Sequence, residues 1–159
     1  MYYRTKFVAL LLLTIMLSAC SNSQGKLSFT PLRMLFRTDT LSQGTRQSVT
    51  RFEEYLVDNY SDSKEAEKQI DSFAFKNVSS DVGKYTSYQM IFYKKTSRTT
   101  VETIKDYKNW IPPESLDDMI YNYWWNKGKF LVRYKLKNGV IVDPPNNIKV
   151  TNIPTDSKQ

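Results

Sequence analysis

The chain has 159 residues, a formal net charge of +7, no histidine and a single cysteine. Without histidine it lacks the commonest general base and metal ligand of proteins, which excludes Ser-His-Asp catalysis and histidine-bound metal. Aromatic residues make up 14% of the chain, more than a disordered polymer would carry, and the length suits one packed domain rather than two.

The first 20 residues have the pattern of a secretory signal peptide. Two basic residues precede an apolar run over 7–17, and small residues then lead to the only cysteine, in the order Leu17-Ser18-Ala19-Cys20. This motif resembles the lipobox of bacterial lipoproteins, whose cysteine is acylated and becomes the first residue of the mature protein. The resemblance implies a signal peptide over 1–19, lipid attachment at Cys20 and a lipid bilayer as a partner.

A transmembrane anchor is the alternative interpretation of this segment. The apolar run would form a helix of about 16 Å, whereas the hydrocarbon core of a bilayer is about 30 Å thick, so the signal peptide is the better interpretation. In lipoproteins of enteric-type bacteria, an aspartate directly after the cysteine retains the protein at the inner membrane. Ser21 occupies that position in this chain, so the resemblance implies the outer membrane if the host is Gram-negative.

Cleavage before Cys20 would leave 21 basic and 16 acidic residues, which is a net charge of +5. This charge favours anionic neighbours such as lipid headgroups or acidic envelope polymers. Nucleic acid is not expected as a partner of an exported, tethered protein. Acylation would also use the only thiol, which leaves no disulfide, no thiol catalysis and no cysteine-bound metal in the mature chain.

The polar residues over 20–26 are predicted to form a flexible, lipidated tether. A loosely packed lead-in follows over 27–48. Its apolar part over 27–37 either packs on the domain as a short strand or lies on the bilayer, and the proline at position 31 favours packing.

Two helices are predicted next. Apolar residues at every third or fourth position predict the first helix over 45–60. The second helix follows a break at 61–63, where Asp62 and Glu65 have the spacing of a capping box. The short break predicts an antiparallel helical hairpin that rests on a flat partner.

The rest of the chain supplies that flat partner. Aromatic and β-branched residues over 85–95 predict a strand, and a capping-box spacing at Thr99 begins a short third helix. Alternating patterns over 119–126 and 130–137, with the turn dipeptide Asn138-Gly139 before a last apolar run, predict an antiparallel meander.

These elements predict an α+β fold in which the helical hairpin and the short third helix pack on a C-terminal antiparallel meander sheet. The order of the elements is similar to that of NTF2-like cone folds, which often leave a pocket between the helices and a curved sheet. A single domain is expected over 27–153, with an edge strand over 148–153 and a polar tail over 154–159.

One group of candidate contact residues is aromatic. Alternation along the predicted strand sends Tyr121, Tyr123 and Trp125 into the core and leaves Trp124 on the opposite face. An exposed aromatic face can stack on sugars or peptides, so Trp124 is the better candidate for contact with a ligand or partner, with Trp110 nearby.

The other group is basic. Arg133, Lys135 and Lys137 alternate with apolar residues and are expected to share one face of the sheet, with Lys127 and Lys129 at the preceding turn. This face would hold the domain against an anionic membrane or polymer. The alternative is a solvated face whose lysines discourage aggregation.

The remaining chemistry consists of carboxylates. The adjacent pairs Glu53-Glu54 and Asp117-Asp118 point apart rather than converge, and the second pair suits a turn. The chain also has no Gly-rich phosphate loop. We therefore predict no catalytic residue, metal or cofactor, and do not expect an enzyme.

The sequence favours a membrane-anchored lipoprotein of the cell envelope whose domain is a binding or accessory module. Two alternatives stay open. One is an NTF2-like pocket protein that binds a small hydrophobic ligand. The other is an inhibitor or immunity protein that blocks an envelope protein through its aromatic and basic sheet face.

Overall fold

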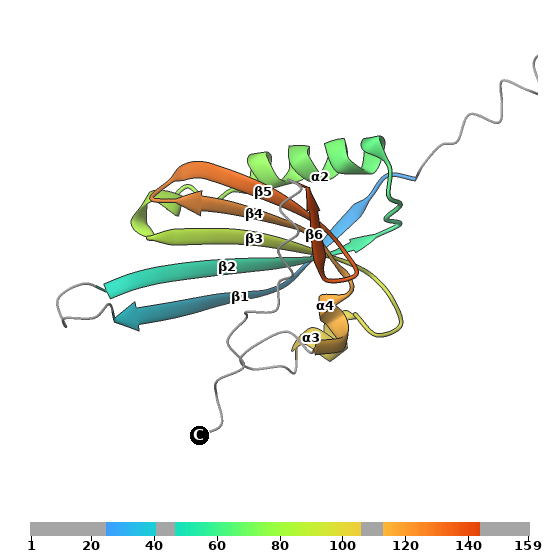
Figure 1. Cartoon of the computed structure of the whole chain (residues 1–159), viewed down its shortest axis with the longest axis horizontal. Coiled ribbons are helices and arrows are strands. Elements are labelled where there is room, and N and C mark those ends of the chain that lie inside the picture. Colours follow the sequence, from blue (N-terminus) through green and yellow to red (C-terminus); the bar gives the residue numbers. More distant parts are fainter. Residues whose placement is uncertain (1–24, 41–46, 106–112, 144–159) are drawn as a thin grey trace, which may run out of the picture.

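The computed structural model describes residues 25–40, 47–105 and 113–143, and these residues contain a single six-stranded sheet whose strands follow one another in chain order (Figure 1). The strands are β1 (Ser28–Thr40), β2 (Gln47–Asp58), β3 (Ser87–Lys94), β4 (Met119–Asn126), β5 (Lys129–Lys137) and β6 (Val140–Asp143). The predicted signal peptide, most of the tether, the edge strand over 148–153 and the polar tail lie outside the described residues.

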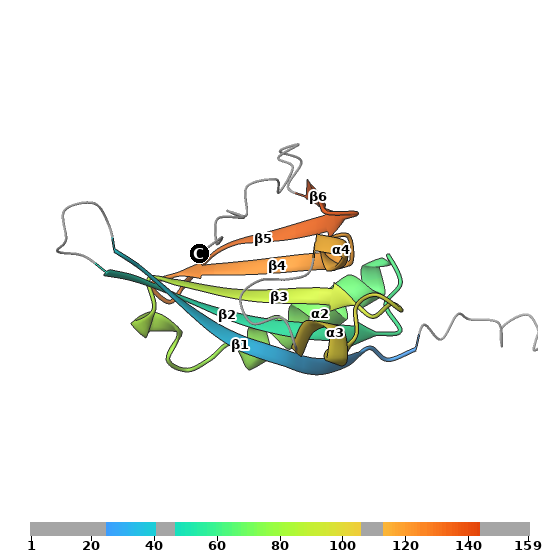
Figure 2. The same ribbon diagram turned by 90° about the horizontal axis from the view of Figure 1, so that it is seen from below.

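The sheet is antiparallel except where β2 and β3 pair in parallel. Parallel neighbours need a crossover connection, and helix α2 (Lys64–Asn77) supplies it, followed by the 3₁₀ turn η1 (Val82–Lys84). Two short helices, α3 (Val101–Lys105) and α4 (Pro113–Leu116), connect β3 to β4. They lie on the sheet face opposite α2 (Figure 2).

The predicted helical hairpin is wrong. Residues 45–60, predicted as its first helix, largely form β2, which pairs with β1 on one side and β3 on the other. The predicted lead-in over 27–48 largely forms β1, an edge strand in which Pro31 lies at an irregularity of the pairing, where proline is tolerated. The resemblance to NTF2-like folds depended on the helical hairpin and is wrong as well, because the domain begins with two paired strands.

The error has a physical cause, which is that β2 holds buried charges. Arg51 and Glu53 are buried and form an ion pair with each other, and buried Glu54 pairs with Arg33 of β1 at 2.6 Å. In the sequence these charges resemble the polar face of an amphipathic helix. In the sheet they are compensated by partners, one of which comes from a neighbouring strand that no local pattern identifies.

The second helix and the meander are confirmed. α2 begins after Ser63, whose Oγ accepts a hydrogen bond from the Ala66 N–H at 3.2 Å, so Ser63 is the cap rather than the predicted Asp62. β4, β5 and β6 pair antiparallel in order. Asn138 and Gly139 have φ values of 51° and 72°, as a type I′ turn requires.

The short third helix is α3, whose first residue, Val101, lies two residues after Thr99, the predicted cap. Thr100 is its cap, because the Thr103 N–H donates to Thr100 Oγ1 at 3.2 Å and the Thr100 N–H donates to Thr103 Oγ1 at 2.9 Å. This reciprocal pair works as a capping box with threonine at both positions.

Aromatic side chains fill the space between α2 and the sheet. Tyr88, Phe92, Tyr121 and Tyr123 are almost entirely buried there, against Ile70 of α2. A smaller apolar core lies on the other face of the sheet, beneath α3 and α4, and consists of Leu56, Ile91, Tyr93, Ile104, Met119, Leu136 and Ile141.

Candidate functional site

An irregularity in the pairing of β4 with β5 decides which way the predicted contact residues point. Trp125 pairs with Phe130, but the neighbouring Trp124 pairs with Val132, so Leu131 is an extra residue in β5. A bulge of this kind moves the side chains that follow it to the other face of the sheet. The alternation predicted along β5 is therefore broken after Phe130.

Arg133 and Lys135 consequently lie on the α2 face of the sheet. Arg133 pairs across the strands with Tyr123, and Lys135 with Tyr121, both of which are buried under α2. The prediction that these two cations share a face opposite the buried aromatic residues is wrong, because the one-residue bulge reverses their direction.

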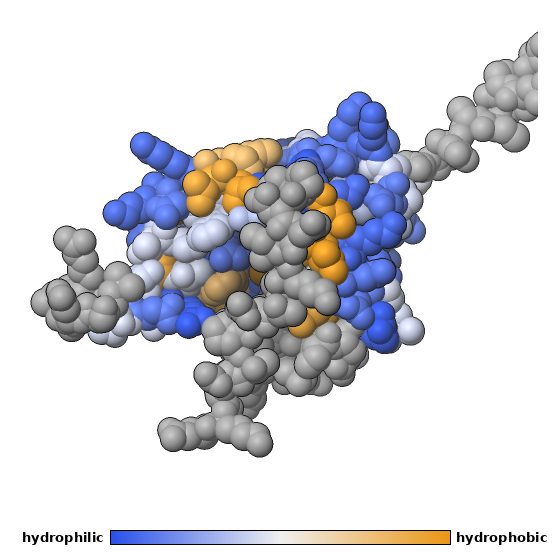
Figure 3. Space-filling model, in the orientation of Figure 1, coloured by the Kyte–Doolittle hydropathy of each residue, from blue (hydrophilic) through white to orange (hydrophobic). Residues whose placement is uncertain are grey.

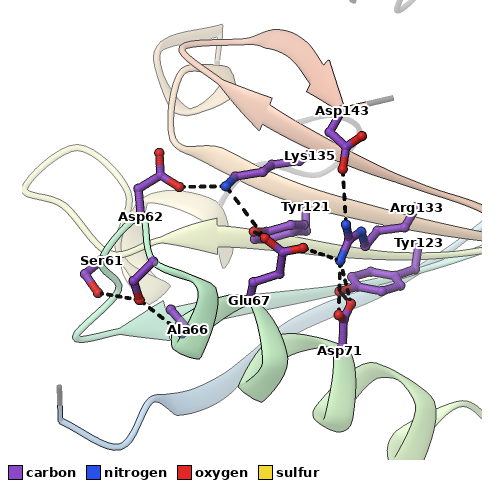
Figure 4. Close-up of polar contacts among 11 residues, drawn as sticks. Ser61, Asp62, Ala66, Glu67, Asp71, Tyr121, Tyr123, Arg133, Lys135 and Asp143 are labelled. Atoms are coloured by element: carbon purple, nitrogen blue, oxygen red, sulfur yellow. Dashed lines mark hydrogen bonds and ion pairs between the residues drawn. The ribbon is translucent and has the colours of Figure 1, made fainter. Parts of the chain in front are cut away.

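Arg133 is held by three carboxylates (Figure 4). Its Nη1 atom lies 2.8 Å from Glu67 Oε1 and 3.0 Å from Asp71 Oδ2, both on α2, and its Nη2 atom lies 3.2 Å from Asp143 Oδ2 on β6. Asp71 also accepts a hydrogen bond from the Tyr123 hydroxyl at 2.5 Å. Arg133 therefore joins α2, β5 and β6 through one side chain.

Lys135 extends the same cluster. Its Nζ atom lies 2.7 Å from Asp62 Oδ1 in the turn before α2 and 3.8 Å from Glu67 Oε2. The Tyr121 hydroxyl donates to the same Glu67 Oε2 atom at 3.4 Å. Carboxylates of α2 and of the turn before it thus neutralise the charges of Arg133 and Lys135, so these two cations form ion pairs within the domain.

The pKa values of this cluster follow from its contacts. Burial acts to lower the pKa of Arg133, but the hydrogen bond and negative charge of Asp71 outweigh it, and the pKa is raised. The hydrogen bond with Asp62 raises the pKa of Lys135, and the same bond lowers the pKa of Asp62. Arg133, Lys135 and Asp62 therefore keep their charges over a wider range of pH than the free side chains do.

Trp124 lies on the sheet face away from α2, as its register predicts, and is half-buried. Its Nε1–H donates to Ser87 Oγ at 2.7 Å, and beside it the Asn122 side-chain amide donates to Gln89 Oε1 at 3.0 Å. Trp124 thus lies in a row of neutral polar side chains on β3 and β4. The aromatic residues predicted to be core are buried: Tyr121, Tyr123 and Trp125.

The other predicted site residues are not brought together with Trp124. Lys137 is exposed at the end of β5 and forms no ion pair with the described residues. Lys127 and Lys129 are exposed at the turn between β4 and β5. Cys20 and Trp110 lie outside the described residues.

The sequence places Lys64 to Lys68 on a solvated helix face and does not single out the cations of α2 as candidate site residues. Lys64, Lys68 and Lys76 are exposed, and within the described residues none of them lies within 4.0 Å of a carboxylate. A signal was available, because steps of four or eight residues place all three on one side of a helix.

Asp118, a carboxylate outside the cluster, has structural partners of its own. Asp118 is fully buried and accepts hydrogen bonds from Thr96 Oγ1 at 2.6 Å and Thr99 Oγ1 at 2.7 Å, with Lys94 Nζ at 3.4 Å. Burial acts to raise the pKa of Asp118, but these hydroxyl donors and Lys94 lower it overall. Asp118 therefore fastens the segment that follows β3, which agrees with the turn role predicted for Asp117-Asp118.

An open groove runs between the start of β1 and α2, and its lining includes Lys26, Leu27, Lys68, Ser72 and Lys76. No group of three or more cysteine or acidic side chains in the described ranges is placed to hold a metal ion. None of the helices in the described part of the chain is long and apolar enough to cross a membrane. Comparison with models of protein families, with curated proteins and with solved structures finds no match for this chain.

Proposed function

We propose that this protein is an exported lipoprotein, attached to a membrane of the cell envelope through acylated Cys20, and that its domain is a binding or accessory module rather than an enzyme. One observation carries the proposal. The only cysteine of the chain stands directly after Leu17-Ser18-Ala19, at the end of an apolar run of signal-peptide length.

The entry of the chain into the domain is compatible with a tether. The Leu27 N–H donates to Gln69 Oε1 of α2 at 2.9 Å, and Leu27 itself is buried. Lys26, one residue earlier, is exposed. The six residues between Cys20 and Leu27 would therefore link the lipid to a fixed point on the domain.

The surface proposed for partner contact is the sheet face that carries Trp124. Its indole combines an apolar ring with a fixed N–H donor, and the neighbouring amides of Asn122 and Gln89 supply further polar contacts. Arg133 and Lys135 are less suited to this role than the sequence predicted, because carboxylates of α2 and of the turn before it already bind them. Among the described residues, no carboxylate forms an ion pair with Lys137.

The packing bears on one of the two alternative functions. A pocket for a small hydrophobic ligand under α2 is not favoured, because buried aromatic side chains occupy that space. An inhibitor or immunity role would use the same Trp124 surface as an accessory module. The identity of the partner distinguishes these two roles.

The anchor is tested by labelling growing cells with palmitate. Cys20→Ala should abolish lipid labelling and accumulate the uncleaved precursor, while Ser23→Ala in the tether should change neither. Normal processing and membrane extraction of the Cys20→Ala variant would contradict the anchor.

The contact surface is tested by a photocrosslinking amino acid at Trp124 in intact cells, with the same group at exposed Glu65 of α2 as the control. Capture of the same identified envelope protein at position 124 but not at position 65 would support the proposal. Equal capture at both positions, or capture at neither, would contradict it.

A further inference from the structure

Helix α2 directs two of its carboxylates to the sheet and exposes its lysines, together with Glu65, on its outer side. Glu67 and Asp71 point toward the sheet, where they bind Arg133 and Lys135 (Figure 4). The side chains exposed on the outer side of the helix include three lysines without ion pairs in the described residues. We call this outer surface the α2 ridge and define it by Lys64, Lys68, Ser72, Phe75 and Lys76.

The α2 ridge ends in an exposed apolar patch. Phe75 is 49% exposed and its ring lies 5.0 Å from that of Phe130, which is 44% exposed, and the bulge residue Leu131 beside it is 57% exposed. Figure 3 shows an orange patch bordered by blue where β5 begins near the end of α2. Lys127 and Lys129 lie at the adjacent turn and are also exposed.

The tether enters the domain beside this ridge. Leu27 is bound to Gln69 of α2, and the groove between Lys26 and the helix is lined by Lys68 and Lys76. The six residues that separate Cys20 from Leu27 reach at most about 20 Å when fully extended. A lipid on Cys20 would therefore keep the domain within a short distance of the bilayer, close to the side that carries the lysines.

We infer that the α2 ridge is a membrane-docking surface, which rests against an anionic lipid bilayer through its lysines while the patch of Phe75, Phe130 and Leu131 enters the headgroup region. The inference rests on the proposed anchor at Cys20. Lysines near an anionic surface and partly buried aromatic and aliphatic side chains are the two contributions that hold interfacial segments on membranes.

Docking through the α2 ridge would also fix how the other face of the sheet is oriented relative to the membrane. The lipid keeps the ridge at high effective concentration near the bilayer, so contacts too weak to bind a free domain are enough to orient a tethered one. The Trp124 face and α3 lie on the other side of the sheet (Figure 2). They consequently point away from the membrane, toward whatever partner approaches from the aqueous side.

The chemistry of the anchor supplies a clean probe. Because Cys20 is the only cysteine and its thiol carries lipid in the anchored protein, Ser72→Cys introduces a unique reactive thiol on the ridge. The matched control is Lys105→Cys, an exposed position on α3. The lipidated variants are labelled with an environment-sensitive fluorophore and reconstituted into vesicles of phosphatidylcholine, with or without phosphatidylglycerol.

The inference predicts that the probe at position 72 enters an apolar environment only in vesicles that contain phosphatidylglycerol, and that raising the salt from about 0.1 M to about 1 M reverses this change. The probe at position 105 should report water in every vesicle. A water-like signal at position 72 on the anionic vesicles, or the same signal at both positions, would overturn the inference.

Charge variants test the lysines directly. Lys64→Gln, Lys68→Gln and Lys76→Gln, combined in the Ser72→Cys background, should lower the ratio of docked to undocked protein about fivefold for each lysine lost. The matched control combines Lys95→Gln, Lys105→Gln and Lys137→Gln, which remove the same charge elsewhere and should leave the ratio within about twofold. Equal effects of the two sets would overturn the ridge as the docking surface.

Mass spectrometry of the purified protein separates this inference from the proposed function. If Cys20 carries no lipid, the anchor and the docking surface both fail. If Cys20 is acylated and the protein floats with the vesicles while the ridge stays in water, the docking surface alone is refuted. Circular dichroism confirms that each variant is folded before its signal is compared.

Discussion

Arg133 on β5 and Asp71 on α2 form an ion pair at 3.0 Å, and Asp71 is at the same time the acceptor for the buried hydroxyl of Tyr123. The pair fastens the crossover helix to a strand that is three positions away from β2 in the sheet. Because both partners are partly shielded from water, the contact is worth more than an ordinary surface ion pair.

Arg133→Met should lower the free energy of unfolding by about 2 kcal/mol, because it leaves Glu67, Asp71 and Asp143 without their shared cation. Urea denaturation followed by circular dichroism measures this loss. The control is Lys95→Met, which removes a surface pair with Asp58 and should cost about 0.5 kcal/mol or less. Equal losses of unfolding free energy in the two variants would show that the ion pair of Arg133 with Asp71 stabilises the domain no more than a surface ion pair does.

Tyr123→Phe should cost about 1.5 kcal/mol, because the mutation leaves a carboxylate of Asp71 without its short hydrogen bond from a buried donor. Tyr121→Phe is the matched comparison. Its hydroxyl is 3.4 Å from Glu67, so its removal should cost about 0.5 kcal/mol. Thermal or urea unfolding of the two variants under one condition ranks them, and the reverse order would contradict the geometry of the cluster.

The bulge at Leu131 should tolerate both substitution and deletion. Leu131→Ser changes an exposed side chain and should alter stability by about 0.5 kcal/mol or less. Deletion of Leu131 removes the extra residue but leaves Trp124 opposite Val132 and Tyr123 opposite Arg133, so Arg133 and Lys135 stay on the α2 face with their carboxylates. We expect the deletion to lower the free energy of unfolding by about 2 kcal/mol or less, measured by urea denaturation. Failure of the deletion variant to fold would contradict the register described for β5.

Alkaline pH should destabilise the domain through its buried tyrosines. Burial, together with the charge and hydrogen bond of Glu53, raises the pKa of Tyr55 to about 12. An unfolded tyrosine has a pKa of about 10, so between these values the unfolded chain releases a proton that the native state retains. The stabilising contribution is therefore complete below pH 10 and is lost as the pH rises toward 12. Urea denaturation at several pH values in this range gives the free energy of unfolding as a function of pH. This free energy should fall less steeply with pH in Tyr55→Phe than in the unchanged protein. The same steepness in both would contradict the raised pKa of Tyr55.

Acidic pH should act through Asp118, whose pKa is lowered in the folded state. A depressed pKa stabilises the native state above the unfolded pKa of about 4, and this contribution is lost as the pH falls through the folded value. Thr99→Val removes a buried hydroxyl donor and should raise the pH at which the domain begins to unfold in acid. Thr38→Val, at an exposed position of β1, is the control, and the same acid midpoint for both would contradict the role of Asp118.

Local patterns were sufficient for α2, β3 and the meander, because these elements have clear periodicity and a turn dipeptide. They failed for β2, whose polar residues are buried ion pairs, and the partner of Glu54 is 21 positions away on β1. They also missed the bulge at Leu131, because an extra residue leaves no mark in an alternating sequence of apolar and basic residues. One unpredicted residue was thus enough to reverse the faces assigned to Arg133 and Lys135.

Parallel pairing of β2 with β3 has a consequence for how the domain holds together. Within the sheet of the described residues, the hairpin of β1 and β2 pairs with the strands β3 to β6 only along this one seam. α2 bridges it from both sides, since Phe73 stacks on Phe29 of β1 at 4.0 Å while Asp71 binds Arg133 of β5. α2 therefore holds the β1–β2 hairpin and the β3–β6 strands together, and we expect its detachment from the sheet to separate these two parts in a single cooperative step.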